Sequence, residues 1–235
     1  MQNQKIISFK YKFVFEDGTE KIFKLNLDAD KLELIHNNEL EKPDWALHDN
    51  FACPLECHLK KESKYCPIAI NIHNIIKQFG SMPSFQKVKV YVETENRTYF
   101  KETSLQAGIG SLFGIIMPTS GCPTLGKLKP LVKYHLPFAS IDETEFRVFS
   151  MYMLAQFLAM KKNIKADWEM KKLKQLYEDI QSINRNIAQR IADLEKLDAS
   201  INSVIVLNNF ADSVSFSLEE NLSNFEKLFE SWLKD

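Results

Sequence analysis

The chain has 235 residues, of which 45% are hydrophobic, and its 30 basic and 31 acidic residues leave a net charge of −1. This composition is typical of a globular protein whose hydrophobic core needs no disulfide bonds to fold. The near-neutral charge argues against a protein that binds nucleic acid or a membrane surface, because both use an excess of positive charge.

No stretch approaches the roughly 18 apolar residues of a membrane span, and the first residues lack the apolar stretch of a signal peptide. We therefore expect a cytoplasmic protein with no membrane partner. Thiols stay reduced in that compartment, so clustered cysteines indicate metal ligands or redox groups rather than structural disulfides.

Alternating apolar residues predict an antiparallel sheet in the first part of the chain. Residues 5–15 alternate, an Asp-Gly turn follows at 16–19, and apolar residues at 22–27 return as a second strand. A short third strand is expected at 31–35, and a second hairpin is expected at 88–101. Together these segments predict one antiparallel sheet.

A polar segment and a helix are expected between the two hairpins. The segment at 36–66 carries prolines and no periodicity. A loop of this length in a compact domain needs something that orders it, such as a metal. A helix is predicted from Pro67, since proline suits the first helical turn, to about Phe79.

Helical periodicity dominates the second half of the chain. The first helix there is expected to end at Pro118. Ser140 and Glu143 form a capping box, which begins a helix to about Lys162. Because this helix is apolar almost all round, we expect it to be the central buried helix of a bundle.

Two further helical segments complete the predicted bundle. A helix is expected at 167–197, with Asp167 as its cap and apolar positions spaced close to a heptad. That spacing fits either packing within the chain or a homodimer seam, and we favour packing because the neighbouring helices also need a partner. The last segment spans about 199–233, with a break expected at 212–213.

The predicted fold class is therefore α+β. An N-terminal antiparallel sheet of two hairpins and one helix is followed by a C-terminal helical bundle. The sheet region covers 1–103 and the bundle covers 104–235, and we expect them to pack as one unit.

The four cysteines are the strongest functional signal in the sequence. Cys53, Cys57 and Cys66 lie within fourteen residues, and Cys122 follows in a Thr-Ser-Gly-Cys-Pro turn. Four soft ligands, three plus one, are what a tetrahedral zinc ion or an iron–sulfur cluster requires. Three of the four precede a proline, which gives a small preference for iron–sulfur. His58 suits a ligand less well, because it is adjacent to Cys57.

Several alternatives to a closed metal site remain. If one cysteine is not a ligand, the open position would suit a redox or metal-dependent enzyme. A disulfide switch would pair Cys57 or Cys66 with Cys122. If the cysteines are unconnected, the chain is a helical interaction or dimerisation scaffold with free thiols. No pattern indicates a catalytic site, and we interpret His135 as a partly buried histidine that is hydrogen-bonded to the backbone.

Four short motifs stand out along the chain. They are Phe-Ala-Cys53-Pro-Leu, Tyr-Cys66-Pro-Ile-Ala-Ile-Asn, Thr-Ser-Gly-Cys122-Pro and Tyr134-His-Leu-Pro-Phe-Ala-Ser140. Together they resemble an uncharacterised family of bacterial proteins with no assigned activity. That family's first cysteine pair reads Cys-Pro-x-Cys-Pro, whereas this chain has one more residue between the two cysteines and lacks the second proline. The resemblance covers nearly the whole chain and implies a shared cysteine site but no reaction.

Overall fold

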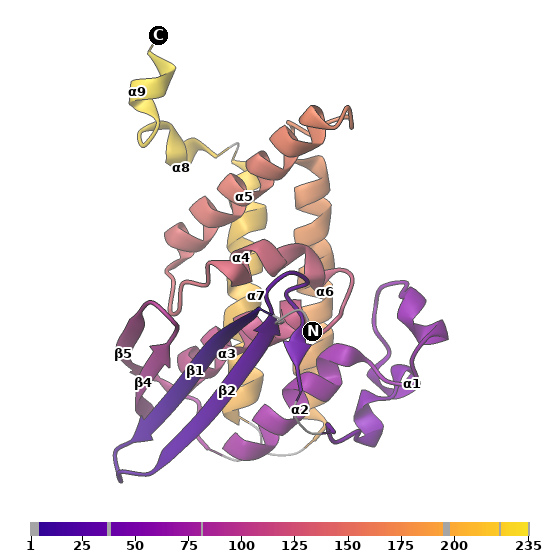
Figure 1. Cartoon of the computed structure of the whole chain (residues 1–235), viewed down its shortest axis with the longest axis vertical. Coiled ribbons are helices and arrows are strands. Elements are labelled where there is room, and N and C mark those ends of the chain that lie inside the picture. The colour runs from indigo at the N-terminus through magenta and orange to yellow at the C-terminus, as the bar shows by residue number, and fades with distance from the viewer. Residues whose placement is uncertain (1–4, 37–38, 81, 195–197, 221, 235) are drawn as a thin grey trace.

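The computed structural model describes residues 5–36, 39–80, 82–194, 198–220 and 222–234. A five-stranded antiparallel sheet, in the order β3-β2-β1-β4-β5, occupies the first half of the chain. The second half is helical, and the two parts are visible in Figure 1. The predicted α+β class is confirmed.

The first hairpin consists of β1 (Ile6–Phe15) and β2 (Glu20–Asp28). Gly18 in the Asp-Gly turn has a φ of +82°, a left-handed conformation that glycine adopts without steric cost. β3 (Leu34–Ile35) then pairs with β2 at the sheet edge. Because side chains alternate along a strand, β1 turns one set toward the core. That buried set is Phe9, Tyr11, Phe13 and Phe15.

The second hairpin consists of β4 (Lys87–Glu93) and β5 (Thr98–Ser104), and β4 pairs with β1. Between the hairpins, α2 (Pro67–Phe79) has the bounds that the sequence predicts. The apolar positions of α2 face the core because they recur at helical spacing. Its buried residues are Ile68, Ala69, Ile72, Ile75, Ile76 and Phe79.

The helix α3 (Leu105–Thr119) packs closely on the sheet. A Cβ atom at Gly108 would lie 2.7 Å from Phe13 Cε1 and 3.0 Å from Val90 Cγ2. Only glycine permits this approach without a shift of the neighbouring side chains. The sheet and the helical half therefore share one core.

The helical half continues along the chain into the bundle. Its elements are η3 (Leu125–Leu128, a 3₁₀ turn), α4 (Lys129–Lys133), α5 (Ile141–Lys161), α6 (Lys171–Ala192), α7 (Asp198–Glu219), α8 (Ser223–Glu226) and α9 (Glu230–Leu233). α6 and α7 form an extensive pair, and α7 also packs against α3 and α5. α7 is therefore the central helix of the bundle.

Hydrogen bonds confirm the predicted signals at two helix starts. At the start of α5, Glu143 N–H donates to Ser140 Oγ at 3.2 Å, and Ser140 N–H donates to Glu143 Oε2 at 2.7 Å. Asp167 accepts from the N–H groups of Lys171 and Lys172, at the first turn of α6. α6 itself begins later than expected, and residues 195–197 of the predicted helix lie outside the described residues.

Two predicted helix ends are wrong. α3 continues through Pro118 by one residue, since a proline this close to the helix end removes only one backbone hydrogen bond. α7 is unbroken at Asp212 and Ser213. The Ser213 hydroxyl donates to Glu145 Oε1 of α5 instead of competing for the helix backbone.

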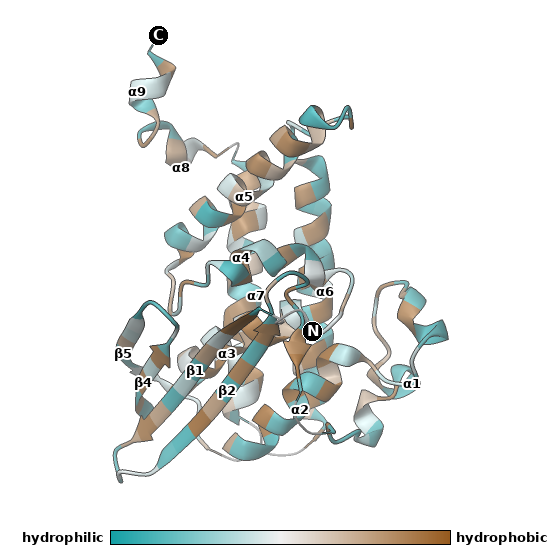
Figure 2. Cartoon of the chain, viewed as in Figure 1, coloured by the Kyte–Doolittle hydropathy of each residue, from teal (hydrophilic) through white to brown (hydrophobic). Residues whose placement is uncertain are grey.

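The prediction that α5 is the central buried helix is also wrong. Its buried residues are Glu145, Val148 and Phe149, whereas Leu154 and Leu158 are 60% and 53% exposed. A helix that is apolar all round carries no signal for which face the fold will cover. Figure 2 shows the brown, hydrophobic segments along this helix.

The near-heptad stripe of α6 is buried within the chain. Its members are Leu173, Leu176, Ile180, Ile183, Ile187 and Ile191. α7 packs along α6 and covers much of this face. The described part of this stripe therefore packs within the bundle, as the favoured alternative predicts, while a homodimer through 167–197 stays an untested prediction.

Candidate metal centre

The cysteines lie at the ends of helical elements or in turns beside them. Cys53 follows α1 (His48–Phe51), and Cys57 precedes η2 (His58–Lys61), a 3₁₀ turn. Cys66 is the residue before α2, and Cys122 lies in the turn after α3. Free backbone N–H groups occur at helix starts, so those at the start of α2, and those before η3, can donate to the sulfur atoms of Cys66 and Cys122.

Short elements order the segment at 39–66, which the sequence presents as an aperiodic loop. It contains η1 (Asp44–Ala46), α1 and η2. An isolated bridge joins Leu47 to Tyr65, and Cys66 N–H donates to Ala46 O at 2.8 Å. These backbone bonds join the two ends of the segment, so Cys53 and Cys57 lie on one loop that is closed at its base.

The segment docks on two helices of the core. Phe51 is fully buried, and its carbonyl accepts from Asn186 Nδ2 at 2.9 Å and Arg190 Nε at 3.3 Å, both on α6. Trp45 Nε1–H donates to His73 Nδ1 on α2 at 3.2 Å. These contacts hold both helices beside the cysteines.

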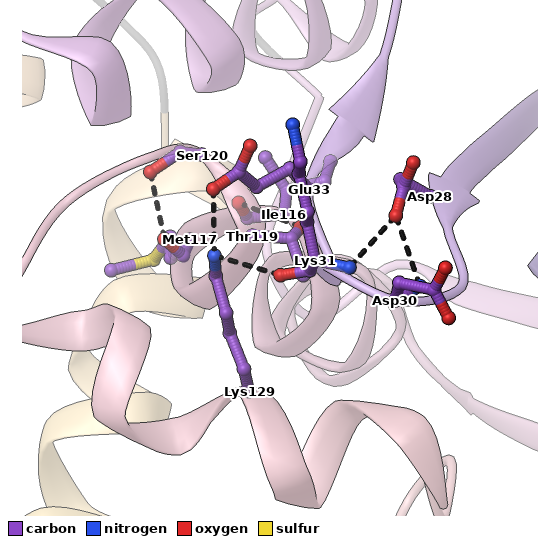
Figure 3. Close-up of polar contacts among 9 residues, drawn as sticks. All are labelled: Asp28, Asp30, Lys31, Glu33, Ile116, Met117, Thr119, Ser120 and Lys129. Atoms are coloured by element: carbon purple, nitrogen blue, oxygen red, sulfur yellow. Dashed lines mark hydrogen bonds and ion pairs between the residues drawn. The ribbon is translucent and has the colours of Figure 1, made fainter.

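The turn that carries Cys122 lies against the start of α2. Gly121 has a φ of +100°, and a Cβ atom there would lie 3.9 Å from Pro67 Cβ. Figure 3 shows how Lys129 ties this region to the sheet edge, with Nζ donating to Lys31 O at 3.0 Å and to Glu33 Oε1 at 3.1 Å. The residue after Cys66 and the residue before Cys122 are therefore neighbours in space.

Burial dominates the acid–base behaviour of the thiols. It raises the pKa of Cys66 to about 12 and also raises the pKa values of Cys122 and Cys53. The charges of Cys122 and Cys53 contribute to the raised pKa of Cys66, and those of Cys53 and Cys57 contribute to the raised pKa of Cys122.

Backbone N–H groups oppose this rise by donating toward the sulfur atoms. The donors belong to residues two and three positions after the cysteine. They are Ile68 and Ala69 for Cys66, Thr124 and Leu125 for Cys122, and Leu55 for Cys53. Turns of this kind stabilise a thiolate ligand.

The cysteines nevertheless do not stand at ligand spacing. Within the described residues, no group of three or more His, Cys, Asp or Glu side chains is arranged to hold a metal ion. All four cysteines, each of which the structure describes, are free thiols. His58 is exposed beside Cys57. Among the described residues, the segments of Cys66 and Cys122 therefore adjoin, but no coordination shell is closed.

Sequence reasoning missed His48, the first residue of α1. This side chain is 6% exposed, and within the described structure neither ring nitrogen has a hydrogen-bond partner. Burial lowers the pKa of His48, and the charge of Lys60 in the cysteine segment lowers it further. Buried polar atoms without partners are rare. A single histidine without a spacing pattern gives no sequence signal for such a position.

Comparison with protein families covers both halves of the molecule. The model of a family described as Domain of unknown function (DUF6901) matches residues 9–230, so the chain belongs to this family. No curated protein and no solved structure matches. The matched range includes all four cysteines, while the family motifs and the bacterial origin stay predictions. In the part of the chain that is described, every helix is too short or too polar to cross a membrane.

Proposed function

We propose that this member of the DUF6901 family binds an iron–sulfur cluster or a zinc ion through Cys53, Cys57, Cys66 and Cys122. The observation that carries the proposal is the position of the Cys122 turn against Pro67, which follows Cys66. A metal with these ligands needs that approach, because the two cysteines belong to segments far apart in the sequence.

The surroundings of the thiols support the proposal. Cys66 and Cys122 each have two backbone N–H donors, which favour the thiolate that a metal needs. Burial opposes that charge when no metal is present. A bound cation reverses the balance, because it displaces the thiol protons and neutralises the thiolates.

Metal binding requires the sulfur atoms to move closer together. The cysteine segment is suited to this adjustment, since few packed contacts hold it between Cys53 and Cys66. Its exposed side chains there are Pro54, Glu56, His58, Lys60, Lys61, Glu62, Ser63 and Lys64. The metal would supply the order that packing does not.

Four thiolates from the protein close the coordination shell of a metal. A closed shell leaves no position for substrate, so the proposed role is structural, redox or sensory rather than hydrolytic. Iron–sulfur is the first choice, because N–H donors to cysteine sulfur also tune the potential of a cluster.

The test is anaerobic purification of the full chain, followed by a visible spectrum and elemental analysis. Wild type is compared with Cys122→Ser and with a matched control, Ser120→Ala, two residues away in the same turn. Among the described residues, Ser120 Oγ donates to Met117 O alone, at 2.8 Å, so its loss removes no proposed ligand.

A brown protein with iron and sulfide, lost in Cys122→Ser and kept in Ser120→Ala, would establish a cluster. A colourless protein with about one zinc per chain and the same dependence would establish a zinc site. Metal content that is absent from wild type, or equal in Cys122→Ser, would refute the proposal.

A further inference from the structure

A cavity of about 360 Å³ lies between the end of the sheet and the helical half, and none of the four cysteines lines it. It is bounded by β5, α3, the η3–α4 region, α5, α6 and α7. Most of its wall is apolar, and representative lining residues are Phe113, Met117, Leu128, Leu131, Leu207 and Phe210. This size lies near the lower end of the roughly 300–1,000 Å³ of small-molecule sites.

Two polar side chains of α6 reach this cavity without hydrogen-bond partners. Asn184 is 2% exposed, and its Oδ1 is buried with no partner in the described structure. Tyr177 is 4% exposed, and its hydroxyl makes no hydrogen bond to any described residue. A buried polar atom without a partner costs free energy, so Asn184 Oδ1 favours a hydrogen-bond donor in the cavity. The Tyr177 hydroxyl can donate to a polar occupant or accept from one.

Arg147 of α5 brings a positive charge to the same cavity. Its Nη2 donates to Leu131 O at 2.8 Å and to Tyr134 O at 2.9 Å. Among the described residues it forms no ion pair with a carboxylate. Glu143 influences the pKa of Arg147, but its carboxylate accepts from Ser140 N–H at 2.7 Å. The guanidinium therefore keeps donors for a further acceptor, since it carries five N–H groups.

The charges around the cavity have one sign. The lining includes Arg147 and Lys101 and no aspartate or glutamate. His135 also lines the cavity, and its Nε2 bonds to the Tyr11 hydroxyl at 2.8 Å. That hydroxyl also bonds to Ser111 Oγ at 2.9 Å. An occupant with a negative head and an apolar body would match this wall.

We propose that the cavity binds an apolar carboxylate such as a medium-chain fatty acid. The hydrocarbon chain lies among the leucine, phenylalanine and methionine side chains, where its burial provides most of the affinity. The carboxylate accepts from Arg147, with the Tyr177 hydroxyl as a further donor. An amine is excluded by the positive charge, and an alcohol leaves the guanidinium uncompensated.

The test is calorimetric titration of the full-chain protein with monomeric decanoate, decanol and decylamine. Decanoate is expected to bind at least about tenfold more tightly than decanol, since a charge-assisted hydrogen bond contributes about 1.5–3 kcal/mol. Decylamine is expected not to bind. Arg147→Gln should lose about tenfold in decanoate affinity, whereas Arg185→Gln, an exposed arginine on α6, should bind like wild type.

A second variant keeps the test decisive if Arg147→Gln fails to fold. Leu207→Trp fills the cavity with apolar volume and should abolish decanoate binding. No binding of decanoate to wild type, or equal affinities for decanoate and decanol, would overturn the proposal. Unchanged decanoate affinity in folded Arg147→Gln or Leu207→Trp would overturn it as well.

Discussion

The core around Phe13 and the cysteine segment at 39–66 are held together in different ways. Phe13 is fully buried, and its ring centroid lies 5.1 Å from that of Phe79 and 5.8 Å from that of Phe23. In the cysteine segment most side chains are exposed or half-buried. Its buried residues are Ala46, His48, Phe51 and Cys66. Apolar packing therefore specifies the core, whereas backbone hydrogen bonds and two docked aromatic residues, Phe51 and Trp45, specify the segment.

This difference in packing indicates which region of the molecule a bound ligand can make more ordered. A close-packed core has little freedom to respond to a ligand, because small changes in volume are already costly there. A segment with few packed contacts can close around a metal and gain its order from binding. Changes in the core should therefore alter global stability, and changes at the cysteines should act locally.

The largest loss of stability is expected from Phe13→Ala. Truncation of this side chain removes its contacts with both aromatic neighbours and leaves a cavity, at a cost of about 3–5 kcal/mol. Denaturant unfolding followed by circular dichroism measures the change. Phe85→Ala is the control, because Phe85 is 78% exposed and its loss should cost less than about 0.5 kcal/mol. Similar costs for the two variants would contradict the account of the core.

Acid should destabilise the core through His135. Burial, together with the charge of Arg147, lowers the pKa of His135 from its ordinary value of 6.5 to about 3. Between pH 6.5 and 3 the unfolded chain therefore binds the proton that the folded chain excludes, so stability falls as the pH falls.

The matched comparison is wild type with His135→Gln. From pH 7 to pH 4.5, wild type should lose roughly 2–3 kcal/mol more than the variant, which has no titrating ring. Urea unfolding at the two pH values gives both differences. Equal losses would mean that His135 is not held neutral by the fold.

A smaller effect is expected from Gly108→Ala. The new Cβ would meet Phe13 Cε1 at 2.7 Å, so the variant should lose about 1–3 kcal/mol by overpacking. Gly110→Ala is the control on the same helix, where the nearest atom is Ser203 O at an ordinary 3.5 Å. The control should be neutral or up to about 1 kcal/mol more stable, because alanine favours a helix. Thermal unfolding checks this: the unfolding temperature should fall in Gly108→Ala and should stay equal or rise in Gly110→Ala, both relative to wild type.

The smallest expected change in free energy is the stabilisation of the cysteine segment by metal, which limited trypsin digestion measures. Lys60, Lys61 and Lys64 are exposed cleavage sites between Cys57 and Cys66. Free metal at tenfold its Kd should slow cleavage there about tenfold, since binding stabilises the closed segment by about 1.4 kcal/mol. Cys122→Ser should show no such protection. A cleavage rate in wild type that is the same with and without metal would contradict the proposed site.

The sequence predicted most of the sheet and of α2 because their signals are local. The stripe after Pro67 and the capping box of Ser140 and Glu143 define their own elements. α5 was misplaced because an apolar surface all round has no preferred face, and only tertiary packing leaves Leu154 exposed. The end of α3 was misplaced because Pro118 breaks only one hydrogen bond at that point.

The two candidate sites also differ in whether the sequence carries a local signal for them. Four cysteines are visible in a sequence because the residue type itself indicates the chemistry. The cavity was not predictable, since Arg147, Tyr177 and Asn184 are ordinary helical residues until packing brings them to one wall. The backbone bonds that close the cysteine segment, such as the one from Cys66 N–H to Ala46 O, involve no side chain and so leave no pattern.

The central claim is that four cysteines share one metal, and X-ray absorption at the metal edge tests it most directly. The full chain, purified anaerobically, should show a first shell of sulfur alone, at about 2.3 Å from the metal for zinc or iron. Cys57→Ser should replace one sulfur with a lighter atom. A shell dominated by nitrogen or oxygen in wild type, or one unchanged in Cys57→Ser, would contradict the account.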